Sequence, residues 1–295
     1  MKTETTNLTS IALFGSVVRG DFDKYSDKDI LLVGNKSLEI NSLKNQLGKN
    51  KWSCASYTWD KLNYLKSQQS LFIQHLKKES WILHDHNENY KTFLSNYNPK
   101  SDYTKEYYNS NNLFKSLEYL NDNHYSNLWA LDVLSVGFRN LAIFRLANEG
   151  IYEFSHKSII QSLHKIGLIN HEDIPLLLKL RVLKRLFRKK TLFVFPTQKE
   201  TLQLIETVNK CFKIGLESKV LKSDDFSDKI LSLVNKPNHF DNYQKIRSIE
   251  AYMIANKIHN ERLDKIISNP QENLKAFANH SDEYFESLNS SSKTS

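Results

Sequence analysis

The chain has 295 residues, of which 40% are hydrophobic and 12% aromatic, and its formal net charge is +8 at pH 7. This composition excludes a low-complexity chain and suffices for one or two domains with a buried core. Two cysteines exclude a disulfide framework, and neither an apolar run of about 20 residues nor a signal-peptide segment is present, so we expect a cytoplasmic protein with no membrane partner.

The first 90 residues alternate short apolar runs with amphipathic ones, which indicates an α+β domain. The apolar runs predict strands over residues 11–14, 27–34, 51–57 and 81–84. Helical spacing predicts helices over residues 38–47, 59–65 and 70–78. The second strand is apolar almost throughout, so we expect it in the middle of the sheet.

Two aspartates, Asp27 and Asp29, stand at the start of the second predicted strand. Side chains alternate along a strand, so both project from the same face. Gly15 and Ser16 follow the first strand, and a glycine there lets main-chain N–H groups approach a phosphate closely. Paired carboxylates opposite such a turn suit magnesium and the phosphates of a nucleotide. We therefore predict a nucleotide-transfer site in this segment.

This segment resembles the signature of the polymerase-β-type nucleotidyltransferases, most closely their minimal and antibiotic-modifying branch. The family pattern is Gly-Ser, then Arg-Gly, then Ser-Asp-x-Asp before a hydrophobic strand. It is met here by Gly15, Ser16, Arg19, Gly20, Ser26, Asp27 and Asp29. The resemblance implies a small mixed sheet flanked by helices in residues 1–90. It also implies transfer of a nucleoside monophosphate from a nucleoside triphosphate, expected to be ATP, with Mg²⁺ or Mn²⁺.

The resemblance also implies roles for individual residues. Asp27 and Asp29 would bind metal and carry catalysis, while Gly15, Ser16 and Ser26 would bind the nucleotide. For Arg19 two alternatives stand open.

Arg19 is expected either to pair with a phosphate or to form a salt bridge with Asp21 or Asp23. His75 lies next to the apolar face of the predicted helix 70–78. A histidine in such a place is more often a hydrogen-bonded packing residue than a base, although it would line the site if the helix lies there.

The sequence departs from the family pattern at the third carboxylate, which the family supplies from the next strand. Residues 51–57 contain no acid, and Cys54 or Ser56 occupies the expected place. Asp60, just beyond, is either the third acid or a first-turn residue stabilised by the dipole of the following helix. The protein then either works with two acids and a base from elsewhere, or has kept only nucleotide binding.

Residues 91–107 are polar and contain Asn98-Pro99, which is typical of a linker. Beyond it, residues 108–289 have helical spacing and predict an all-α domain. The tail, residues 290–295, is expected to be disordered. The predicted helices cover residues 113–120, 126–148, 155–166, 174–187, 199–217, 227–234, 243–259 and 271–288.

The pair Arg139-Asn140, inside the longest predicted helix, resembles the Arg-Asn of HEPN helical domains. No histidine follows where those ribonucleases have one, so the ribonuclease interpretation is weak. Comparable helical domains in aminoglycoside nucleotidyltransferases form the acceptor wall. We expect Arg139 to have a structural partner or to contact the acceptor.

A basic amphipathic segment covers residues 179–190. Its charged face is either solvated or contacts the phosphates of an RNA such as tRNA, and a membrane ranks last. The positive net charge favours anionic partners in general. The face consists of Arg181, Lys184, Arg185 and Arg188, opposite an apolar stripe of Leu180, Leu183 and Phe187.

Taken together, the sequence predicts a two-domain nucleotidyltransferase whose acceptor is a protein, an RNA or a small molecule. The resemblance makes a bacterial toxin–antitoxin or phage-defence module, with a partner protein, the expected context. The alternative is a catalytically impaired protein that senses nucleotides or binds RNA as a regulator.

Overall fold

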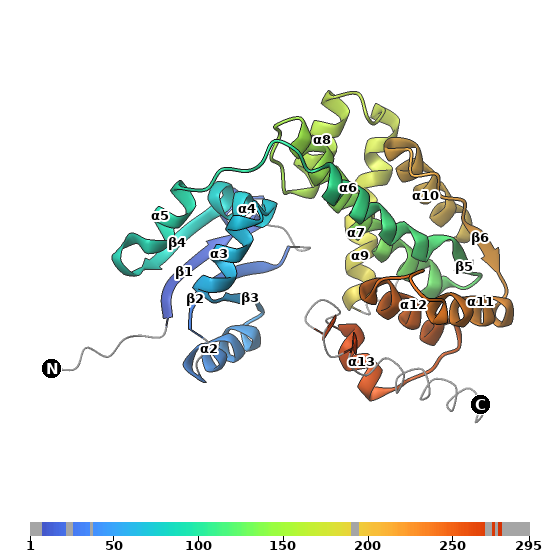
Figure 1. Cartoon of the computed structure of the whole chain (residues 1–295). Helices are drawn as coiled ribbons and strands as arrows, with labels where there is room; N and C mark the ends of the chain where they lie inside the picture. The colour runs from blue at the N-terminus through green and yellow to red at the C-terminus, as the bar shows by residue number, and fades with distance from the viewer. Residues whose placement is uncertain are drawn as a thin grey trace. The chain divides into compact units, whose positions relative to one another are not determined.

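The computed structural model describes residues 8–21, 26–35, 38–189, 195–268, 273–274 and 277–278. Two compact units are present (Figure 1). The first consists of Met1–Thr104 and Ile143–Leu163, and the second of Lys105–Ala142 and His164–Ser295. None of the described helices combines the length and the apolar character needed to cross a membrane. The predicted α+β class is confirmed, because a mixed sheet precedes a mostly helical region.

The first unit is built on a four-stranded sheet with strand order β3-β2-β1-β4. β1 runs antiparallel to both β2 and β4, whereas β2 and β3 are parallel. The predicted central position of β2 is confirmed. The strands are β1 (Leu8–Phe14), β2 (Lys28–Gly34), β3 (Trp52–Tyr57) and β4 (Ser80–Asp85).

One row of residues across this sheet positions the candidate site. Phe14 of β1 pairs with Asp29 of β2 on one side and with Ser80 of β4 on the other. Asp29 in turn pairs with Ser53 of β3. Paired residues on neighbouring strands point to the same face of a sheet, so these four side chains share one face.

Helices cover that face. Its apolar side chains, among them Phe14, Leu31 and Val33, pack with buried residues of three helices to form the core. Thr58 and Ser70 cap two of these helices by accepting hydrogen bonds from main-chain N–H groups. The helices of this region are α1 (Ser16–Arg19), α2 (Leu38–Lys49), α3 (Trp59–Ser67), α4 (Leu71–Glu79) and α5 (Asn89–Ser95), with a short 3₁₀ turn η1 (His86–Glu88) before α5.

The predicted linker over residues 91–107 begins too early. Phe93, Leu94 and Tyr97 are buried and belong to the core of the first unit. Their apolar spacing is masked in the sequence by the polar residues between them. The first unit continues to Thr104 and then includes Ile143–Leu163, where Asn148 accepts a hydrogen bond from the main-chain N–H of Tyr103 (2.6 Å).

The second unit is mostly helical, as predicted, with one local exception. The sequence predicts a helix over residues 113–120, but the structure has a 3₁₀ helix η2 (Asn112–Leu117) followed by the short strand β5 (Tyr119–Asn121). β5 pairs in parallel with β6 (Lys219–Leu221), a partner about 100 residues away that local periodicity does not reveal.

Most of the remaining helices follow the predicted ones closely, but the helices over Thr104–Asn111 and Glu261–Ser268 were not predicted. α10 ends at Phe212 rather than at residue 217, because Lys213 adopts a left-handed conformation (φ 52°). The predicted helix 271–288 lies outside the described residues except for 273–274 and 277–278, and the tail 290–295 lies wholly outside them. The helices are α6 (Thr104–Asn111), α7 (His124–Asn148), α8 (His156–Lys165), α9 (Ile174–Lys189), α10 (Gln198–Phe212), α11 (Ser223–Asn235), α12 (Asn242–Ala255) and α13 (Glu261–Ser268), with a 3₁₀ turn η3 (His171–Asp173) before α9.

An ion cluster centred on the buried Asp132 joins α7, α9 and α12 in the second unit. Asp132, which is 0% exposed, accepts hydrogen bonds from Arg188 Nε (2.7 Å) and from Arg247 Nη2 (2.7 Å). Arg247 also pairs with Glu250 (2.9 Å). Burial by itself raises the pKa of Asp132, but Arg247 and Arg188 outweigh it and hold that pKa below its ordinary value.

Candidate active site

The turn after β1 lies directly against Asp29. Gly15 has φ 72° and ψ −138°, a conformation that essentially only glycine adopts without strain. A Cβ atom at this position would lie 3.2 Å from Asp29 Oδ2. The glycine therefore does two things: it allows the chain to turn at the end of β1, and it leaves room for the carboxylate of Asp29 beside the turn.

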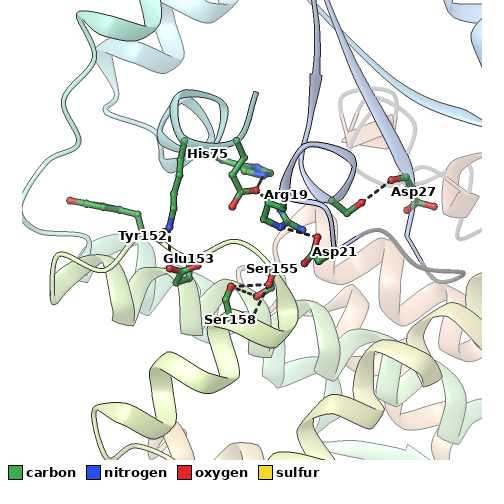
Figure 2. Close-up of polar contacts among 11 residues, drawn as sticks. Arg19, Asp21, Asp27, His75, Tyr152, Glu153, Ser155 and Ser158 are labelled. Atoms are coloured by element: carbon green, nitrogen blue, oxygen red, sulfur yellow. Dashed lines mark hydrogen bonds and ion pairs between the residues drawn. The ribbon is translucent and has the colours of Figure 1, made fainter. Parts of the chain in front are cut away.

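A second contact joins this turn to Asp27, two residues before Asp29. The hydroxyl of Ser16 donates a hydrogen bond to the main-chain carbonyl of Asp27 (3.3 Å), which Figure 2 draws as a dashed line. Asp27 is exposed and Asp29 is half-buried, so both carboxylates are accessible to a ligand. Ser26, immediately before them, is half-buried. The turn lies beside Asp29 and the main chain of Asp27, as predicted. β2 begins at Lys28, however, so Asp27 precedes the strand, and its alignment with Asp29 on one face stays a prediction.

The hydrogen bonds of the turn leave particular donors for a ligand. The N–H of Gly15 is used, because it donates to the main-chain carbonyl of Glu79 (3.1 Å). The N–H groups of Val18 and Arg19 both donate to the carbonyl of Gly15. Within the described residues, nothing accepts a hydrogen bond from the N–H of Ser16 or of Val17. These two N–H groups, rather than that of Gly15, are the donors that remain for a phosphate.

Arg19 takes the ion-pair alternative, with one partner that the sequence did not suggest. Its Nε contacts Asp21 (3.1 Å), and its Nη1 contacts the carboxylate of Glu79 at the end of α4 (Figure 2). Asp23, the other predicted partner, lies outside the described residues. Glu79 is only 3% exposed, and its carboxylate also contacts His75 Nε2 (2.9 Å).

Glu79 carries its charge in spite of its burial. Burial raises the pKa of Glu79, but the hydrogen bond and charge of His75 together with the guanidinium of Arg19 bring it below its ordinary value. The ring of His75 stacks on Phe154, with the centroids 4.5 Å apart, and meets Phe14 edge-on. The interpretation of His75 as a hydrogen-bonded packing residue fits these contacts.

The segment that holds Phe154 is fixed to α4 by a second residue. Lys78 Nζ donates to the carbonyl of Tyr152 (2.5 Å) and contacts Glu153 (3.0 Å). Ser155 then caps α8 by accepting a hydrogen bond from the N–H of Ser158 (3.0 Å), and Figure 2 labels both residues.

The residue of β3 that lies beside Asp29 is Ser53. Ser53 pairs with Asp29 and shares its face of the sheet, whereas Cys54 and Ser56 point to the opposite face. The prediction that Cys54 or Ser56 stands where an acid would face Asp29 is therefore wrong, because the face of each β3 residue depends on the register between β2 and β3.

The structure does not bring Asp60 to the acid pair. Asp60 is exposed in the first turn of α3, beyond the far end of β3. Four strand residues of about 3.3 Å each separate Ser53, beside Asp29, from the end of β3 at Tyr57, which is roughly 13 Å. Asp60 is therefore a first-turn residue of the helix, the second of the two alternatives.

The donor set fits a metal that binds together with its substrate. Within the described part of the chain, no group of three or more His, Cys, Asp and Glu side chains is arranged to hold a metal ion. Mg²⁺ is commonly held by one or two carboxylates with the phosphates of a nucleotide completing the shell. Asp27 and Asp29 beside the turn are such a pair, and the space that a Cβ of Gly15 would fill is left open beside Asp29.

The residues predicted to contact RNA or acceptor belong to the second unit. Arg188 is bound to the buried Asp132, although its own side chain is 49% exposed. Arg181, Lys184 and Arg185 are half-buried on α9, and Arg139 is half-buried on α7. These four have polar or electrostatic partners of their own. The basic face of α9 is thus less open than its sequence suggests.

Sequence reasoning missed Glu79 and Phe154. A signal for Glu79 was present, because His75 and Glu79 stand four residues apart on one helix and are therefore neighbours on its surface. No local signal exists for Phe154, which reaches α4 from a segment more than 70 residues later.

Comparison with known families supports the same assignment for this part of the chain. Residues 1–94 match the family model described as Nucleotidyltransferase domain. The N-terminal part of the chain is therefore a nucleotidyltransferase domain, consistent with the polymerase-β-type superfamily. Comparison with the curated proteins gave no match, and comparison with the solved structures gave none either.

Proposed function

We propose that the protein is a nucleotidyltransferase that moves a nucleoside monophosphate from a nucleoside triphosphate to an acceptor hydroxyl, with ATP as the nucleotide and Mg²⁺ or Mn²⁺ as the metal. The nucleotidyltransferase domain at residues 1–94 supports nucleotidyl transfer in general. The observation that carries the more specific proposal is the closeness of Gly15 to Asp29, whose carboxylate would lie 3.2 Å from a Cβ at Gly15. It places this carboxylate beside a turn in which nothing described accepts from the N–H of Ser16 or Val17.

The proposed reaction is an in-line displacement at the α-phosphorus. The acceptor oxygen forms a bond to this phosphorus, the bond to the bridging oxygen of the β-phosphate breaks, and pyrophosphate leaves with the electron pair. The acceptor proton is released to water or a base. When bound, the divalent metal neutralises charge on the triphosphate. In this scheme Asp27 and Asp29 bind the metal, and the N–H groups of Ser16 and Val17 hold the outer phosphates.

The acceptor and the biological setting are further parts of the proposal. We propose a protein, an RNA or a small molecule as the acceptor, and a toxin–antitoxin or phage-defence module with a partner protein as the setting. Both proposals are supported by the resemblance of the segment 15–29 to minimal nucleotidyltransferases. The net charge of +8 adds support, because it favours anionic ligands.

The direct test is transfer of label from each α-³²P-labelled nucleoside triphosphate, with Mg²⁺ or Mn²⁺, to RNA, to small hydroxylated acceptors and to the products of neighbouring genes. The wild type is expected to label one acceptor, and Asp29→Asn to lose on the order of 10³-fold in rate, or about 4 kcal/mol. Asp60→Asn is the matched control and should keep its activity. Labelling that survives Asp29→Asn would contradict the proposal.

A second candidate is a nucleotide-sensing or RNA-binding regulator without transferase activity. The presence of Ser53 in place of a third acid favours it. This alternative predicts tight nucleotide binding without transfer to any acceptor. RNA binding through α9 predicts an affinity that falls steeply with salt and after Arg185→Glu.

A further inference from the structure

Glu79 is tied to both ends of the phosphate-binding turn. Its main-chain carbonyl accepts the hydrogen bond from Gly15 N–H (3.1 Å), where the turn begins. Its carboxylate pairs with Arg19, where the turn ends. One residue at the junction of α4 and β4 therefore fixes Gly15 and Arg19 relative to each other. The N–H donors of Ser16 and Val17 lie between these two points.

The carboxylate of Glu79 is itself held in place from a third direction. His75 Nε2 lies 2.9 Å from the same oxygen that Arg19 contacts. The imidazole of His75 is only 14% exposed and is clamped between Phe14 and Phe154. The turn is thus connected through Glu79 and His75 to the core of the first unit and to its segment Ile143–Leu163.

Glu79 is not placed to take part in chemistry directly. It is 3% exposed, so neither a metal-bound nucleotide nor an acceptor can reach its carboxylate. The other carboxylate oxygen, Oε1, is buried and has no hydrogen-bond partner among the described residues. A buried acid with an unsatisfied oxygen costs stability, so packing alone does not account for an acid at this position.

We propose that Glu79 is a positioning residue that holds the Gly15–Arg19 turn in the geometry required to bind a metal-bound triphosphate, and that His75 orients its carboxylate. This inference rests on the proposed function, because it assigns the turn to phosphate binding. Displacements of about 1 Å in such a site reduce activity strongly, which is why a rigid anchor for a short turn matters.

The test compares Glu79→Gln with the wild type in equilibrium dialysis against α-³²P-labelled ATP with Mg²⁺. The variant keeps the shape of the side chain and removes its charge. We expect at least a tenfold loss of affinity for Mg·ATP, measured well below the unfolding temperature of both proteins. The matched control is Glu88→Gln, which removes an exposed ion pair with Lys91 in the same unit and should bind as the wild type does.

Variants of Arg19 keep the test informative if Glu79→Gln does not fold. Arg19 is 22% exposed and tolerates change better than a buried residue. Arg19→Gln should lose as much affinity as Glu79→Gln, and Arg19→Lys, which keeps the charge but only part of the fork, should lose less. The double variant should be no weaker than either single one, because both changes break the same contact.

The outcomes separate the inference from the proposed function. A wild type that binds no nucleoside triphosphate with Mg²⁺ contradicts the proposed function and, with it, the role of Glu79. A wild type that binds, with folded Glu79→Gln and Arg19→Gln proteins that bind equally well, overturns the role of Glu79 alone. Additive losses in the double variant would also overturn it, because they would mean that the two residues act separately.

Discussion

Asp29 in the first unit and Asp132 in the second have opposite surroundings. Asp132 is fully buried and each of its carboxylate oxygens is held by an arginine. Asp29 is half-buried at the start of a strand, beside a glycine turn that leaves space next to its Oδ2. The first arrangement encloses a charge within the protein, whereas the second places a half-buried charge beside the turn. Substitutions in the two units should therefore separate stability from function.

The largest effect on stability is expected for Asp132→Ala. The change leaves Arg247, which is 4% exposed, without its partner in the core. Loss of one member of a buried ion pair costs about 3–5 kcal/mol, so urea unfolding should detect it easily. The control, Glu206→Ala, removes an exposed pair with Lys210 and should change the free energy of unfolding by less than about 0.5 kcal/mol. Equal losses of unfolding free energy in Asp132→Ala and Glu206→Ala would contradict the structural role given to Asp132.

Gly15→Ala is expected to reduce both stability and nucleotide affinity. The left-handed φ of 72° costs about 1–3 kcal/mol for a residue with a Cβ, and that atom would also meet Asp29 Oδ2 at 3.2 Å. Gly20→Ala is the matched control, since its φ is 76° but nothing lies within 4 Å of the added atom. Both variants should lose stability in thermal unfolding. Only Gly15→Ala should also weaken Mg·ATP binding; equal weakening by Gly20→Ala would contradict the account.

Glu250 should make the second unit sensitive to pH. Burial raises its pKa from 4.5 to about 7, although Arg247 acts in the opposite direction. A raised pKa stabilises the fold below the unfolded value and loses that contribution as the pH rises through the folded one. The free energy of unfolding of the wild type, relative to that of Glu250→Gln, should therefore fall by on the order of 1–2 kcal/mol between pH 5 and pH 8. If the two proteins differ by the same unfolding free energy at every pH in this range, the proposed role of Glu250 is wrong.

The smallest effect is expected for Ser53→Asp, which tests whether an added carboxylate beside Asp29 strengthens metal binding. The new carboxylate would stand beside Asp29 on the same face of the sheet. An added oxygen ligand should tighten Mn²⁺ binding in the presence of nucleotide by about threefold to tenfold. Ser56→Asp adds the same charge on the opposite face and should have no effect. If both variants behave alike, the added charge acts at a distance and not through the metal.

The sheet and its acid pair could be predicted because their signals are local. The apolar runs, the Gly15-Ser16 turn and the position of Asp29 at the start of β2 all lie within one segment. The position of Ser53 could not be predicted, because it depends on the register between β2 and β3. The partners of Arg188 and His75 were hidden for a related reason: Asp132 and Phe154 are distant in sequence, and only the packing of helices brings them together.

The most direct test of the central claim is the metal dependence of nucleotide affinity, measured by equilibrium dialysis with Mg²⁺ and with EDTA. The claim is that Asp27 and Asp29 hold the metal of a triphosphate that the Gly15–Arg19 turn binds. The wild type is expected to bind ATP at least tenfold more tightly with Mg²⁺, and Asp27→Asn/Asp29→Asn to show no difference between the two conditions. An affinity that is the same with EDTA in the wild type, or that responds to Mg²⁺ in the double variant, would contradict it.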